Sequence, residues 1–177
     1  MLTRLFIPHQ TVGSNVVHFD FFNAASSGHR IELLSVIPMV SGAVAVTGLV
    51  AVDLFLTRTT AVGTGGTAAT FGGTTLTAMT FTPHNWEGQG IPGGVTARLT
   101  PTGGADAGPV IGWQSVITEE LNGGAYNTYR DMVRLNYPDT PPIQIKPGSG
   151  VRVVQGSVAS VGTIGYNVLF KLISNVG

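Results

Sequence analysis

The sequence predicts an all-β protein, an antiparallel β-sandwich, on three observations. Apolar and polar side chains alternate along several short segments, which is the period of a half-buried strand. No segment sustains the i, i+3, i+4, i+7 spacing of an amphipathic helix. Turn residues separate the alternating segments at intervals typical of a sandwich or barrel, so roughly eight to ten strands are expected.

The first clear strand lies at residues 17–21. Val17, Phe19 and Phe21 share one face there, which leaves His18 and Asp20 together on the other. The same alternation predicts strands at 50–57 and 95–100 and a long final strand whose apolar face is formed by Ile164, Tyr166, Val168, Phe170 and Leu172. The only helical candidate is a short turn at 118–124, which two glycines would end.

Residues 143–153 predict a β-hairpin. Ile143 and Ile145 lead into Pro147 and Gly148, and an alternating segment with Arg152 follows. Pro followed by Gly is typical of a tight turn between paired strands.

Residues 35–52 are uncharged and about as long as a membrane span. Pro38 and two glycines interrupt them, no Lys or Arg cluster flanks them, and their Val and Ile content favours strands. Two buried strands joined by a turn near Ser41 and Gly42 are therefore expected, with a transmembrane segment as the alternative.

Composition predicts one domain over residues 1–177, because 43% hydrophobic residues are ample for a core. The net charge is zero and the pI is about 6.9, so neither nucleic acid nor an anionic membrane is an expected partner. The absence of cysteine excludes disulfides and thiolate metal sites. Only 10% of residues are charged, which indicates a surface covered by partners in an assembly.

Residues 1–12 do not resemble a secretory leader, because Pro8 and His9 come before any apolar run of the necessary length. They are expected to form an N-terminal arm. This arm is apolar and precedes the first clear strand. Its expected role is to grip another protein or another copy through Leu2, Leu5, Phe6 and Ile7. Deleting Met1 to His9 is then expected to abolish that contact and leave the fold intact.

The segment Thr57–Phe81 consists mainly of Thr, Gly and Ala, and three interpretations compete. A phosphate-binding loop would need a helix directly after its glycines, and poor helix formers follow instead. A flexible linker would need a separate core on each side. The favoured interpretation is an exposed loop that leads into a strand near Leu76, Met79 and Phe81.

No coherent catalytic set is present, so no enzyme activity and no cofactor are expected. His18 and Asp20 have the spacing of two metal ligands on a strand, and a third ligand would have to come from His9, His29 or His84. The favoured interpretation of this pair is a solvated or interface-facing strand surface, and metal binding is the alternative.

Aromatic residues beside Asn, Arg and Gly mark two loops as candidates for partner or sugar contact. The candidates are Trp86, Tyr126, Tyr129 and Arg130. Alternatively, these aromatic rings cover the ends of the sandwich.

Three stretches carry a resemblance to a known group of proteins. They are LTRTTAVGTGGTAATFGGTTLTAMTF from Leu56, RLTPTGG from Arg98, and IKPGSGVRVVQGSVASVGTIGYNVLFKL from Ile145. In this order they look like the small jelly-roll structural proteins of tailed bacteriophages, over about Leu49 to Leu172. Two departures are Ala78, where such chains often have Pro, and Lys171 in place of an acidic, aromatic finish.

The resemblance implies a jelly-roll-like sandwich that is a virion component on the capsid surface. It implies a decoration or cement protein that binds the major capsid protein as a homo-oligomer, with a trimer as the expected order. The alternative is a tail, baseplate or fibre protein whose β-sandwich binds a carbohydrate or a receptor.

Overall fold

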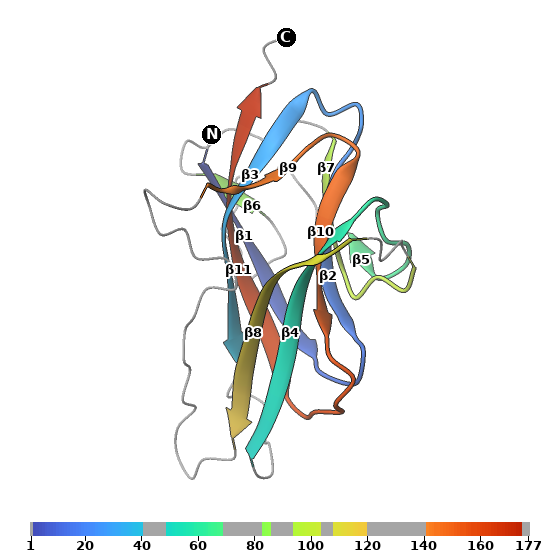
Figure 1. The fold of residues 1–177 in the computed structure, drawn as a ribbon, viewed down its shortest axis with the longest axis vertical. Helices are drawn as coiled ribbons and strands as arrows, with labels where there is room; N and C mark the ends of the chain where they lie inside the picture. Colours follow the sequence, from blue (N-terminus) through green and yellow to red (C-terminus); the bar gives the residue numbers. More distant parts are fainter. Residues whose placement is uncertain are drawn as a thin grey trace.

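A computed structural model describes residues 2–40, 49–68, 83–85, 94–103, 108–119 and 141–174 of the 177-residue chain. These residues form eleven strands in two antiparallel sheets, which pack face to face as a sandwich (Figure 1). The predicted all-β sandwich is therefore confirmed. The predicted helical turn at 118–124 lies largely outside the described residues.

The two sheets are called sheet A and sheet B. Sheet A has five strands, in the spatial order β6 (Pro83–Asn85), β1 (Leu2–Thr11), β11 (Thr163–Ser174), β3 (His29–Val40) and β9 (Ile143–Ile145). Sheet B has six, in the order β5 (Thr67–Ala68), β7 (Val95–Leu99), β2 (Val17–Asn23), β10 (Ser149–Gln155), β4 (Leu49–Thr59) and β8 (Val110–Glu119).

Strand pairing is nested from the outside of the sequence inward. β1 pairs with β11, β2 with β10, β3 with β9 and β4 with β8, all antiparallel. The three remaining strands come from the stretch between β4 and β8. β7 and β5 extend sheet B beyond β2, and β6 extends sheet A beyond β1.

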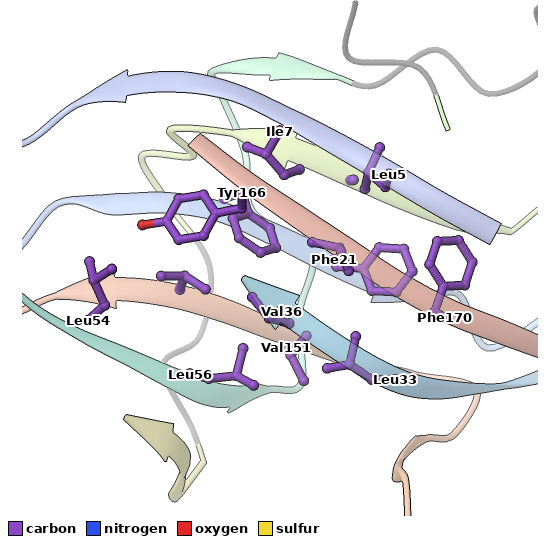
Figure 2. Packing of buried hydrophobic residues seen from close by; sticks show 14 of the residues in the cluster. Leu5, Ile7, Phe21, Leu33, Val36, Leu54, Leu56, Val151, Tyr166 and Phe170 are labelled. Carbon is purple, nitrogen blue, oxygen red and sulfur yellow. The ribbon is translucent and has the colours of Figure 1, made fainter. Parts of the chain in front are cut away.

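The core fills the space between the sheets, as the alternation predicts. All five apolar residues expected on one face of the last strand are buried, and so are Val52, Leu54 and Leu56 of β4. Aromatic rings cross the interface between sheets: Phe21 packs on Phe170 at 4.8 Å between ring centroids (Figure 2). Burial of these large side chains is the main stabilising contribution to such a sandwich.

Residues 35–52 contain the two expected strands. β3 and β4 include the described part of this stretch, and the connection at 41–48 lies outside the described residues. β3 belongs to sheet A and β4 to sheet B, so the two strands lie in different layers of the sandwich. Within the described ranges no helix is long and apolar enough to cross a membrane.

The expected hairpin at 143–153 is wrong in its pairing. The turn itself is present, since the Ser149 N–H donates to the Lys146 carbonyl at 3.1 Å and Gly148 has a φ of +78°. A left-handed Gly after Pro is typical of a type II turn. However, β9 lies in sheet A and β10 in sheet B, so this turn carries the chain between layers.

The N-terminal segment is a strand and does not lack a partner in its own chain. β1 pairs with β11 from Leu2, opposite Lys171, to Thr11, opposite Thr163. Leu5 and Ile7 point into the core and are buried (Figure 2). The expectation of a detachable arm is therefore wrong, because its apolar alternation is that of a core strand whose partner lies at the other end of the sequence.

Candidate functional site

His18 and Asp20 do not share a face, contrary to the expectation from simple alternation. The register of β2 on β10 shifts between Phe19, which lies opposite Val153, and Val17, which lies opposite Val154. This β-bulge inserts His18 as an extra residue and turns its side chain inward. The His18 ring contacts Tyr166 of sheet A edge-on, at 5.5 Å between centroids.

Asp20 lies on the outer face of sheet B, within a row of alternating charge. Its neighbours in the register are Arg98 on β7 and Arg152 on β10. Asp20 and Arg152 are both buried, and Arg152 Nη2 lies 3.8 Å from Asp20 Oδ2, which is an ion pair longer than a hydrogen bond. Opposite charges on adjacent strands attract one another, so the row ties three strands together.

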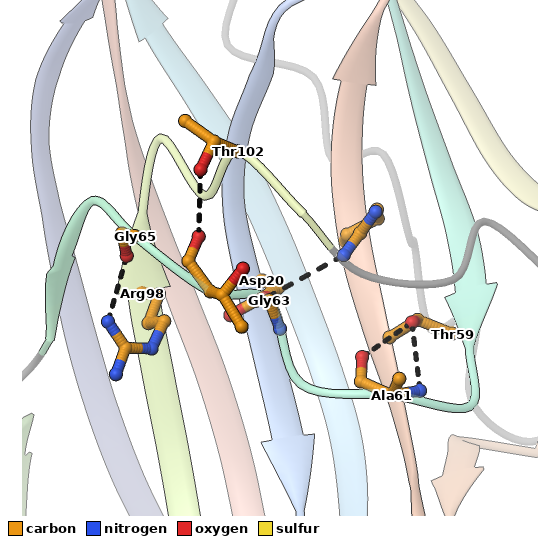
Figure 3. Close-up of polar contacts among 9 residues, drawn as sticks. Asp20, Thr59, Ala61, Gly63, Gly65, Arg98 and Thr102 are labelled. Atoms are coloured by element: carbon orange, nitrogen blue, oxygen red, sulfur yellow. Dashed lines mark hydrogen bonds and ion pairs between the residues drawn. The ribbon is translucent and has the colours of Figure 1, made fainter.

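The Gly-rich loop Thr60–Gly66 covers this row (Figure 3). The Gly63 N–H donates to Asp20 Oδ2 at 2.6 Å, and Arg98 Nη1 donates to the Gly65 carbonyl at 2.8 Å. A Cβ at Gly63 would lie 2.3 Å from Asp20 Oδ2 and 2.4 Å from the Pro101 side chain, so the loop approaches the sheet closely only because glycine stands there.

These contacts argue against a phosphate-binding role for the first part of the segment Thr57–Phe81. The Gly63 amide of the loop faces a carboxylate of the same protein, and the short strand β5 follows instead of a helix. Residues 60–66 form a loop, as the favoured interpretation expects, whereas residues 57–59 continue β4 and the two-residue strand β5 was not expected. The strand expected near Leu76, Met79 and Phe81 lies outside the described residues.

Burial dominates the electrostatics of Asp20. It raises the pKa of the carboxyl above its ordinary value, and the Gly63 N–H and the two arginines reduce this rise. Asp20 is thus held by a backbone donor and two cations of its own chain, which is the environment of a structural carboxylate.

His18 is buried in the core beside Gln155 and Tyr166. Its Nε2 is 3.3 Å from Gln155 Oε1, and because that oxygen can only accept, Nε2 carries the proton. Gln155 also accepts from the Gly13 N–H at 3.0 Å. Burial lowers the pKa of His18 to about 4, so the ring is neutral at physiological pH.

The candidate metal pair is not brought together, and the expectation of a solvated strand surface is wrong because His18 and Asp20 are both buried. His18 and Asp20 point to opposite sides of sheet B, and each is engaged by other groups of the chain. Across the ranges that the structure describes, no three His, Cys, Asp or Glu side chains gather as a metal site would require. The bulge at His18, which sequence periodicity does not reveal, separates the two residues.

The aromatic loop candidates Trp86, Tyr126, Tyr129 and Arg130 lie outside the described residues. An exposed aromatic residue that periodicity did not single out is Trp113 on β8, whose side chain is 59% exposed. Trp113 lies opposite Phe55, which lies opposite Val154, so three strands of sheet B share an apolar row on their outer face. A tryptophan within the uncharged run 110–118 was the available signal.

Four apolar residues of the N-terminal segment divide between two faces of sheet A. Leu5 and Ile7 are core residues and have no surface to offer a partner. Leu2 and Phe6 alternate with them and lie on the outer face, where Phe6 is half-buried beneath the Arg4 guanidinium at 5.9 Å. Only Leu2 and Phe6 of the expected contact set can therefore meet another protein in this fold.

Comparisons with protein families, with curated proteins and with solved structures found no match to this chain.

Proposed function

We propose that this protein is a structural component of a bacteriophage virion, a decoration or cement protein that binds the assembled shell as a homo-oligomer. The observation that carries the proposal is the nested pairing of β1 with β11, β2 with β10, β3 with β9 and β4 with β8. This order supports a jelly roll, an architecture used in viral capsid and lectin domains. The Thr/Gly-rich stretches that resemble phage jelly-roll proteins supply the second support.

The mechanism of such a protein is linkage. A ligand that binds only the closed arrangement of a shell raises the free energy needed to open it. The chain has nine acidic and nine basic residues, so few charged side chains must stay solvated. Such a surface can be covered by partners over a wide area.

The outer face of sheet A is the proposed shell contact. Phe6, Leu169 and Ile37 alternate with core residues of β1, β11 and β3, and all three are half-buried. Leu2 lies at the start of the same face. Apolar side chains on the outer face of a sheet are available to contact a partner.

The test begins with the number of copies of this chain in purified virions, measured by quantitative mass spectrometry. Copies comparable to those of the major capsid protein are expected. A few copies per particle would favour a tail, vertex or fibre position, and absence from virions would contradict the proposal.

Co-sedimentation with shells then tests the contact face. Phe6→Ser is expected to weaken binding, whereas Val158→Ser, a change at an exposed apolar residue in the loop after β10, should not. Equal binding by both variants would exclude the outer face of sheet A as the contact. Circular dichroism checks that each variant remains folded.

A second candidate function is carbohydrate or receptor binding from a tail, baseplate or fibre. The exposed ring of Trp113 favours it, since Asp53 and Ser115 lie beside Phe55 and Trp113 on the same face, and an aromatic ring next to polar groups suits a sugar. A glycan array would test it: selective binding removed by Trp113→Ala or Trp86→Ala supports this role, and no glycan binding opposes it.

A further inference from the structure

The edges of the two sheets differ sharply in length. In the described part of the chain, sheet A ends in β6 and β9, each three residues long, and sheet B ends on one side in the two-residue β5. The fourth edge is β8, which is ten residues long. Short edge strands are a common protection against pairing with another chain, and β8 lacks it.

β8 has few of the other common protections: its pairing with β4 is irregular at Ile111, and Pro109 directly precedes it. Residues 110–118 contain no charged side chain and no proline. Its outer-face side chains Val110 and Trp113 are 55% and 59% exposed, so apolar surface accompanies the edge. By contrast, Pro83 lies within the edge strand β6. A long uncharged edge with an exposed tryptophan has the character of a pairing surface.

Two hydrogen bonds determine which backbone groups of β8 face outward. Gly156 N–H donates to the Asp53 carbonyl at 2.8 Å, so Asp53 directs its backbone toward β10. Arg58 N–H donates to Pro109 at 3.3 Å, so alternate residues of β4 face β8. Ser115, opposite Asp53, therefore forms a pair without backbone hydrogen bonds between the two residues, and its N–H and C=O point to the open edge.

Trp113 has the same orientation as Ser115, because residues two apart in a strand direct their backbone groups to the same side. In the described structure these groups have no strand beside them. The Ser115 carbonyl accepts from Gln114 Nε2 at 2.8 Å, a hydrogen bond that a neighbouring strand would replace. The outward backbone groups together form a ladder of donors and acceptors that another strand can complete.

We propose that β8 of one copy pairs antiparallel with β8 of a second copy about a two-fold axis. A strand edge is complementary to itself in this arrangement, and an uncharged run brings no like charges together. In this arrangement each copy covers the open edge of the other. A partner of a different kind would leave that edge open whenever the partner is not bound. The two six-stranded B sheets would then form one continuous sheet.

This inference deepens the self-association in the proposed function and rests on that part alone. A two-fold axis closes at two copies, whereas the phage resemblance implies three. The number of copies in the smallest stable particle therefore distinguishes the two arrangements.

The first experiment compares Ser115→Pro with Ser115→Ala by sedimentation velocity and light scattering of the purified 18.4 kDa chain over a range of concentrations. Both variants lose the hydroxyl that donates to Asp53, but only proline removes the N–H at the open edge. The unmodified chain and Ser115→Ala should be dimers. The dissociation constant of the Ser115→Pro dimer should be about tenfold higher or more.

The second experiment covers the case in which Ser115→Pro does not fold. Trp113→Lys places like charges near the two-fold axis and should also produce single copies, whereas Val158→Lys adds the same charge at an exposed site in the loop after β10 and should not. A single copy at all concentrations, an odd-numbered smallest particle, or a dimer unchanged by both β8 variants would overturn the proposal. These measurements need no shell, so failed shell binding cannot be mistaken for failed pairing.

Discussion

Acid should destabilise this fold through one buried side chain, His18. Its pKa is about 4 in the folded protein against 6.5 in its unperturbed state, because burial disfavours the charged ring. A base whose folded pKa is lowered contributes stability that is fully present above pH 6.5 and is lost as the pH falls toward 4. In that window the unfolded chain binds a proton that the folded chain does not.

The magnitude follows from the same two values. The difference of about 2.5 pKa units, at 1.36 kcal/mol per unit, predicts a loss of about 3 kcal/mol between pH 7.5 and pH 4. Asp20 acts in the opposite direction: burial raises its pKa, so its contribution is fully present below its unfolded pKa of 3.8 and is lost as the pH rises above that. A comparison of variants is therefore needed to isolate His18.

The assay is urea unfolding of the unmodified chain, His18→Gln and His9→Gln across this pH range, followed by tryptophan fluorescence. The free energy of unfolding of His18→Gln should fall by about 3 kcal/mol less than that of the unmodified chain. His9→Gln makes the same substitution at a half-buried histidine of β1 and serves as the control for the exchange of His for Gln. If His18→Gln shows the same pH dependence as the unmodified chain, the account of His18 as a buried neutral ring is refuted.

Three further changes test the packing of the sandwich by the same unfolding measurement. Phe170→Ala should cost about 3–5 kcal/mol because the ring is fully buried between the sheets, and a cost below about 1 kcal/mol would contradict its place in the core. Gly63→Ala should cost about 1–3 kcal/mol through its collision with Asp20, whereas Gly156→Ala, whose Cβ would lie 3.3 Å from its nearest neighbour, should cost less. Arg152→Met should cost about 3–5 kcal/mol by leaving Asp20 buried without its ion pair, and adding Asp20→Asn should restore part of that loss; strict additivity of the two would argue against the pair.

The parts of this fold that depend on local pattern could be predicted from the sequence. Alternation along β11 identifies its buried face correctly from Ile164 to Leu172, since the two-residue period of a strand requires no knowledge of its partners. The same holds for Val95, Ala97 and Leu99 of β7.

Pairing between distant strands could not be predicted in this way. From sequence alone, β1 has no visible partner, because β11 lies far away along the chain. The turn at Pro147 and Gly148 is compatible either with a hairpin or with a change of sheet. Turn residues determine the local direction of the chain, and packing of the whole core determines which layer receives the next strand.

The site residues show the same division. His18 and Asp20 would share a face in an unbroken strand, and one inserted residue sends them to opposite sides. Bulges carry no strong residue signature outside glycine types, so periodicity alone misplaces the pair. The exposure of Trp113 likewise depends on β8 lying at an edge, which only the order of strands reveals.

The nested pairing of the strands has a consequence for how the protein is made. During synthesis β1 leaves the ribosome first among the strands, and its partner β11 leaves last, so sheet A cannot close until translation has passed residue 174. Leu5 and Ile7 remain open to water and to other nascent chains for that whole period. Contacts between residues so distant in sequence also slow folding, because a large loop must be closed before they contribute. Sheet A is therefore expected to close only after β11 has left the ribosome, so pairing of β11 with β1 should be a late step in folding.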